Sequence, residues 1–131
     1  MKKQETENLV SDHNGSDRHK RYKSRVANII RRSGYTVFGD NENEIAIQTD
    51  RTKAPYYLDI CAVSGSRVVC VEIDGYRGHN SRRSIRKDAH RTTAIIEYFK
   101  AQGLKAQVYR FAFWQLKDAS DQLIAKELQL C

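Results

Sequence analysis

Two β-rich stretches separated by a short turn constrain the fold of this chain more than any other feature. Residues 56–63 and 67–74 are rich in β-branched, aromatic and other apolar residues, with Ser64-Gly65-Ser66 between them. A glycine in such a turn supplies the positive φ that a tight hairpin needs, so the pattern predicts an antiparallel hairpin. Both faces of the two stretches are mostly apolar, which indicates central strands covered on both sides.

The remaining pattern predicts a single mixed α/β domain. We expect a helix over 17–33, a strand over 35–38, a strand or extended loop over 44–48, a helix from Ser81 or Ser84 to about Gln102, a strand over 105–112 and a last helix starting near Asp118 and Asp121. The expected order is α-β-β-β-α-β-α, with a central mixed sheet of about four strands flanked by helices. Residues 1–16 are polar and are expected to form a flexible tail, which leaves 17–131 as the domain.

The positive charge of the chain is concentrated in two segments. The chain has 131 residues, with 23 basic and 16 acidic side chains and a net charge of +7. Residues 18–32 and 77–91 together hold 13 of the basic side chains but only one of the acidic ones. Solvated helix faces usually mix both signs, so two such segments favour a polyanionic partner, above all a nucleic acid.

Targeting signals give no support for export or membrane insertion. No apolar run approaches the roughly 18 residues that a membrane span requires, and no apolar signal segment follows Met1-Lys2-Lys3. We therefore expect a cytoplasmic protein with no membrane partner.

Three carboxylates are predicted to share one face of the hairpin. A two-residue loop of Gly65 and Ser66 pairs Asp59 with Glu72, and Asp74 lies two residues further along the same face. Opposed carboxylates repel each other, so something must compensate their charge, and a divalent cation such as Mg²⁺ prefers such oxygen ligands. A three-residue loop would place Asp59 and Glu72 on opposite faces. Without a metal, the acids would instead be solvated or paired with nearby arginines.

The same register places Cys61 opposite Cys70. A cross-strand disulfide is one outcome of this pairing. Reducing cytosolic conditions favour the other, in which the two residues are small buried apolar side chains.

The acidic residues also carry a resemblance to a known family. Pro55-x-x-x-Asp59 followed by Val71-Glu72-Ile73-Asp74 resembles the P-D-(D/E)-x-K nuclease superfamily, and the longer pattern Glu72-x-Asp74-Gly75-x-x-x-His79, Asp88-x-x-Arg91, Gly103 and Val108-x-Arg110-Phe111 resembles its branch close to very-short-patch repair endonucleases. The resemblance implies a restriction-endonuclease-like core around Mg²⁺. This chain has Asp74 where the motif has lysine, and one more residue than expected between Gly75 and His79.

The resemblance implies a DNA endonuclease that depends on Mg²⁺ (or Mn²⁺). Asp59 and Glu72 would bind the metal, with Asp74 as a third ligand or an outer-sphere partner. His79 is a candidate general base near neutral pH, and Lys87 is a candidate for stabilising the developing charge.

Basic residues near these acids are candidates for holding the nucleic acid. They are Arg77, Arg82, Arg83, Arg86 and Arg91 around the start of the second long helix, and Arg21, Lys23 and Arg25 on the first helix. Asp88 and Arg91 are spaced to pair with each other, and Arg110 is placed either to pair with an acid of the site or to contact phosphate. No recognition-helix pattern is present, which favours recognition of DNA shape, such as a nick or a junction. Resolving a four-way junction needs two active sites and predicts a homodimer.

Two other functions fit the same composition. A non-catalytic nucleic-acid-binding protein on the same fold would bind DNA equally with or without Mg²⁺ and leave it intact. A small protein-interaction domain would show no steeply salt-dependent affinity for DNA.

Overall fold

The computed structural model describes residues 17–39, 44–74 and 82–130. In this part of the chain a four-stranded sheet has the order β1 (Thr36–Phe38), β4 (Ile60–Ser64), β5 (Arg67–Asp74) and β6 (Lys105–Ala112). All neighbours are antiparallel except β5 and β6, which are parallel and joined through helix α3 (Arg82–Lys100). The predicted mixed sheet of about four strands flanked by helices is confirmed.

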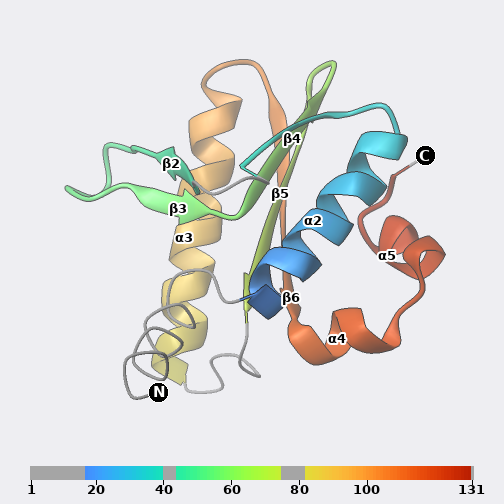
Figure 1. Ribbon diagram of the computed structural model, residues 1–131. Coiled ribbons are helices and arrows are strands. Elements are labelled where there is room, and N and C mark those ends of the chain that lie inside the picture. Colours follow the sequence, from blue (N-terminus) through green and yellow to red (C-terminus); the bar gives the residue numbers. More distant parts are fainter. Residues whose placement is uncertain (1–16, 40–43, 75–81, 131) are drawn as a thin grey trace.

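Helices cover both faces of this sheet (Figure 1). Helix α3 lies against one face, and α2 (Asp17–Arg32), α4 (Phe113–Asp118) and α5 (Asp121–Glu127) lie against the other. The alternation of β5 divides the core accordingly, because Val69, Val71 and Ile73 pack toward α2 whereas Val68 and Cys70 pack toward α3. The two central strands are therefore buried on both faces, as their apolar composition predicts.

The predicted hairpin register is confirmed. Cys61 lies opposite Cys70, and Ser64 lies opposite Arg67, so the connecting loop is Gly65-Ser66. Gly65 has φ +59°, a conformation that glycine adopts without strain. Both cysteines are free and buried, and the neighbouring Cys61 side chain together with burial raises the pKa of Cys70.

Two predicted elements differ from the structure. The single strand expected over 56–63 is divided at Asp59 into β3 (Tyr56–Leu58) and β4, and β3 pairs with β2 (Ile45–Ile47) in a separate two-stranded sheet. The single helix expected from Asp118 is two helices, because Asp118 ends α4 and the Ser120 hydroxyl accepts a hydrogen bond from the Leu123 amide to begin α5. The described elements therefore run α-β-β-β-β-β-α-β-α-α, with two more strands and one more helix than expected.

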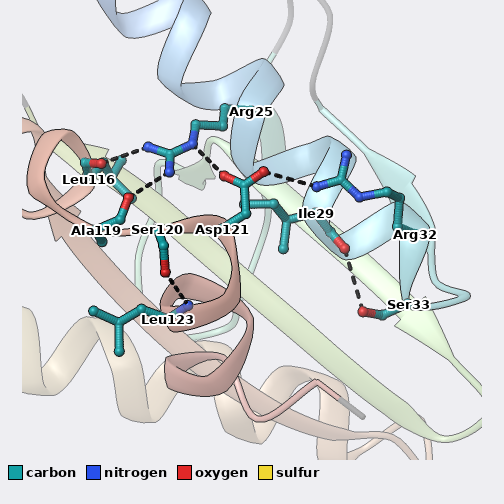
Figure 2. A network of polar contacts seen from close by, with 9 residues as sticks. All are labelled: Arg25, Ile29, Arg32, Ser33, Leu116, Ala119, Ser120, Asp121 and Leu123. Atoms are coloured by element: carbon teal, nitrogen blue, oxygen red, sulfur yellow. Dashed lines mark hydrogen bonds and ion pairs between the residues drawn. The ribbon is translucent and has the colours of Figure 1, made fainter.

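One arginine joins α2 to the two C-terminal helices (Figure 2). The guanidinium of Arg25 donates to the carbonyl oxygens of Leu116 and Ala119, both at 2.6 Å, and to Asp121 Oδ1 at 2.8 Å. Arg32 lies 3.2 Å from the second oxygen of Asp121. These contacts fix the turn between α4 and α5 against α2, so Arg25 holds the fold and is not available to a nucleic acid in this conformation.

Replacing Arg25 with methionine is expected to lower the free energy of unfolding by about 2 kcal/mol, because two carbonyl oxygens lose charged donors. Urea denaturation measures this difference. The matched control is Arg21→Met, an exposed arginine on the same helix, which is expected to change the free energy of unfolding by less than about 0.5 kcal/mol. Equal losses in the two variants would contradict the structural role of Arg25.

Candidate acidic site at the end of the central strands

Asp59 is buried at the point where the chain passes from the small sheet to the large one. It is the only residue between β3 and β4, and 6% of its surface is exposed. Its Oδ2 accepts a hydrogen bond of 2.7 Å from the Ile73 amide of β5. Its Oδ1 lies 3.3 Å from His19 Nε2 of α2, the long limit of a hydrogen bond. Asp59 thus replaces a backbone acceptor of the sheet while directing a second oxygen toward α2.

Glu72 lies on β5 between two arginines. Arg91 of α3 binds Glu72 Oε1 and also donates to the Tyr57 carbonyl, and Arg110 Nε lies 3.3 Å from Glu72 Oε2. Arg110 is the register partner of Glu72 on the neighbouring parallel strand. Of the two roles left open for Arg110, pairing with an acid of the site is the one observed. The spacing of Asp88 and Arg91 predicts that these two residues pair with each other. The structure shows that Arg91 pairs with Glu72.

The two acids share an unusual property. Asp59 Oδ1 and Glu72 Oε2 are both buried and have no hydrogen-bond partner among the described residues, although each has a basic side chain 3.3 Å away. Buried carboxylate oxygens are normally satisfied, because leaving them without a donor costs free energy. Carboxylate oxygens are also the ligands that Mg²⁺ prefers, so the chemistry of these two atoms fits a divalent cation.

The carboxylates do not form a complete metal cluster in this conformation. The prediction that the acids share one face is wrong for Asp59, which contacts α2 on one face of the sheet, whereas Glu72 contacts α3 on the other. The reason is that Asp59 lies in the break between β3 and β4 and not in the β4–β5 ladder. Asp74 lies half-buried at the end of β5. Across the residues that the structure describes, no three histidine, cysteine, aspartate or glutamate side chains form a group that could hold a metal ion. The basic side chains of His19, Arg91 and Arg110 lie beside the acids instead.

The structure adds a further acid that the sequence pattern does not reveal. Ile45 of β2 lies opposite Leu58 of β3, so the next register position places Glu44 opposite Asp59. Partial burial and then the Asp59 carboxylate raise the pKa of Glu44, as expected for two acids facing one another. The weak alternation of residues 44–48 indicated a strand in this segment. It places Glu44 beside Asp59 only once β3 is known to end at Leu58.

His19 is the second residue that sequence reasoning missed. It lies on α2 in the basic segment, and its contact with the Asp59 side chain and the negative charge of that residue raise its pKa despite burial. No spacing pattern connects residues 19 and 59, since the packing of α2 on the sheet brings them together.

The raised pKa of His19 predicts a pH-dependent contribution to stability. Protonated His19 stabilises the fold below its unfolded pKa of about 6.5, and this contribution is lost as the pH rises through the higher folded pKa. We expect wild type and His19→Gln to differ more in urea midpoint at about pH 5.5 than at about pH 8.5. The same difference at both pH values would show that the pair contributes no pH-dependent stability.

The predicted nucleic-acid contacts fall into separate groups. Arg21, Arg86 and Lys87 are exposed and remain available, whereas Lys23 is buried on α2. Arg25 and Arg91 are engaged within the protein, so their predicted contacts with nucleic acid find no support in this conformation.

The structure describes four further predicted residues, and the predicted tail, only in part or not at all. Arg82 and Arg83 belong to the first turn of α3, with no description of their side chains. Arg77, His79 and the tail over 1–16 lie outside the described residues.

Comparisons with known proteins assign no family to the chain. No family model matches the sequence, and no curated protein matches it significantly. Among the described residues, no helix is long and apolar enough to cross a membrane.

Proposed function

We propose that this chain is a metal-dependent DNA endonuclease with a restriction-endonuclease-like core. The observation that carries the proposal is that Asp59, just before β4, and Glu72, near the end of β5, each have a buried carboxylate oxygen without a hydrogen-bond partner among the described residues. The sheet order, with a parallel β5–β6 pair joined through α3, is compatible with the core that the motif resemblance implies.

Asp59 and Glu72 are the residues that would hold Mg²⁺ or Mn²⁺, with Asp74 as a third ligand or outer-sphere partner. Because Asp59 Oδ1 faces α2 and Glu72 faces α3 in this conformation, binding one ion would require their carboxylates to turn toward each other. These residues would hold an ion that would lower the pKa of a water molecule and neutralise charge on the phosphate. Arg91 and Arg110 now neutralise Glu72, and an ion bound by Glu72 would replace part of their contact with this carboxylate.

The reaction is hydrolysis of one phosphodiester bond. The water oxygen forms a bond to phosphorus, one P–O ester bond breaks, a water proton passes to a base, and the leaving oxygen takes up a proton. His79 is the base that the sequence predicts, and exposed Lys87 on α3 is the predicted stabilising charge.

DNA is the proposed substrate because exposed cations come from two elements that flank the acids. Arg21 lies on α2, while Arg86 and Lys87 lie near the start of α3. Contacts of this kind hold phosphates without reading bases, so we propose that the protein selects DNA by shape, as a nick or a junction. Junction resolution further requires a homodimer.

The proposal is tested with linear, nicked, mismatched and four-way-junction DNA incubated with Mg²⁺, Mn²⁺ or EDTA. We expect cleavage of at least one branched or nicked substrate with either metal and none with EDTA. Cleavage that continues in EDTA would contradict metal dependence, and intact DNA in every reaction would contradict the nuclease proposal.

One observation favours a second candidate function, a non-catalytic nucleic-acid-binding protein. Two arginines already neutralise Glu72, and the described acids form no complete metal group. Such a protein would bind the same DNA panel with equal affinity in Mg²⁺ and in EDTA and would leave every substrate intact.

A further inference from the structure

Lys23 is a buried lysine without an anionic partner. Only 4% of its surface is exposed, and in the part of the chain that the structure describes its side chain makes no hydrogen bond or ion pair. Its nitrogen is not among the buried atoms without a hydrogen-bond partner, so the hydrocarbon stem is buried while the ammonium keeps contact with solvent. Arg25, two residues away on the same helix, shows the contrast, since protein oxygens satisfy its guanidinium.

The position of Lys23 connects it to the acidic site. It follows His19 by four residues on α2, and side chains with this spacing are neighbours on one helix face. His19 contacts Asp59, so the same face of α2 borders the Asp59 carboxylate. The positive charge of Lys23 acts to lower the pKa of both His19 and Glu44, which places the ammonium within electrostatic reach of the two groups around Asp59.

We infer that Lys23 contacts the phosphate that is cleaved, a role that rests on the proposed nuclease function. The ammonium donates a hydrogen bond to a non-bridging phosphate oxygen, and its charge stabilises the negative charge that grows there as the water oxygen attacks. No bond to Lys23 forms or breaks. The broken P–O bond and the transferred protons remain those of the hydrolysis described above.

This role also fits the departure of the sequence from its motif. The motif position that usually carries lysine is Asp74 here, at the end of β5, so that strand supplies no cation at this point. An ammonium from α2 instead approaches the site from the side of Asp59. A cation whose stem is held by packing is preorganised for a phosphate that enters the site, whereas exposed Arg21 and Lys87 serve backbone contacts outside it.

The test compares wild type with Lys23→Met, which keeps the length of the side chain but removes its charge. We expect the single-turnover rate constant at saturating DNA to fall at least about 100-fold, with the DNA dissociation constant changed less than about threefold. The control Lys100→Met removes an exposed lysine at the far end of α3 and is expected to cleave as wild type does.

A second readout does not depend on cleavage. Inorganic phosphate with Mg²⁺ is expected to raise the melting temperature of wild type and of Lys100→Met, because a ligand that binds only the folded state stabilises it. This rise should be absent in Lys23→Met. If the methionine variant does not fold, Lys23→Arg should keep the response to phosphate and Lys23→Gln should lose it.

The outcomes separate this inference from the proposed function. Normal cleavage by Lys23→Met, while Asp59→Asn is inactive, overturns the role of Lys23 and leaves the nuclease proposal standing. If wild type cleaves no DNA, the nuclease proposal fails, and the phosphate response alone decides whether Lys23 binds phosphate. An equal response to phosphate in wild type and Lys23→Met overturns the inference in either case.

Discussion

Replacing Asp59 with asparagine is expected to lower the rate of metal-dependent DNA cleavage about 1,000-fold, equivalent to about 4 kcal/mol of activation free energy. The variant removes the charge that a divalent cation requires at Oδ1. Asparagine keeps an oxygen that can accept the hydrogen bond from the Ile73 amide, so the strand contact is retained. Single-turnover cleavage of the preferred DNA in Mg²⁺ measures the effect.

Asp118→Asn is the matched control, because Asp118 is an exposed aspartate at the end of α4. It is expected to cleave at the wild-type rate. Glu72→Gln is expected to lose activity to a similar degree as Asp59→Asn, since it removes the charge beside the second unsatisfied oxygen. Cleavage by Asp59→Asn within about threefold of wild type would remove Asp59 from the site.

Replacing Gly39 with alanine is expected to lower the free energy of unfolding by about 3 kcal/mol. Gly39 has φ +90°, and a Cβ there would lie 2.6 Å from the Asp59 carbonyl oxygen and 3.0 Å from Ile45 Cγ1. Relief of this clash requires the backbone at Asp59 to move, so cleavage activity should fall together with stability. Urea denaturation and the cleavage assay measure the two effects.

Gly34 provides a close control for this substitution. It has φ +93°, nearly the same conformation, but nothing lies within 4 Å of the position of its Cβ. Gly34→Ala therefore carries only the conformational strain, about 1 kcal/mol, and should keep full activity. Equal destabilisation by the two variants would show that the space beside Asp59 tolerates a methyl group.

Local sequence signals predicted the hairpin and its register. The turn at Gly65-Ser66 and the apolar residues on both sides determine which positions face each other, so the Cys61–Cys70 pairing followed from the sequence. The break at Asp59 could not be predicted in the same way. No glycine or proline marks it, and it depends on β2 pairing with β3, a contact between segments separated in the sequence.

The sequence singled out Asp59 and Glu72, but not their relative placement or their surroundings. The hairpin pattern put both acids on one face, whereas the break before β4 lets Asp59 contact α2, and His19 and Glu44 reach Asp59 through packing of α2 and β2. Arg25 shows the limit of charge as a signal. A basic segment binds phosphate only where its side chains remain exposed. The sequence does not reveal that the Arg25 guanidinium is hydrogen-bonded to the carbonyl oxygens of Leu116 and Ala119.

The one-residue link between β3 and β4 leaves no slack between the two sheets. A shift of the small sheet therefore rotates the Asp59 backbone. Conversely, a rotation of the Asp59 backbone moves Leu58 and, through the pairing of the two strands, Ile45. The position of the β2–β3 sheet and the orientation of the Asp59 carboxylate are therefore coupled. A molecule that binds to the β2–β3 sheet would change the orientation of the carboxylate without contacting it.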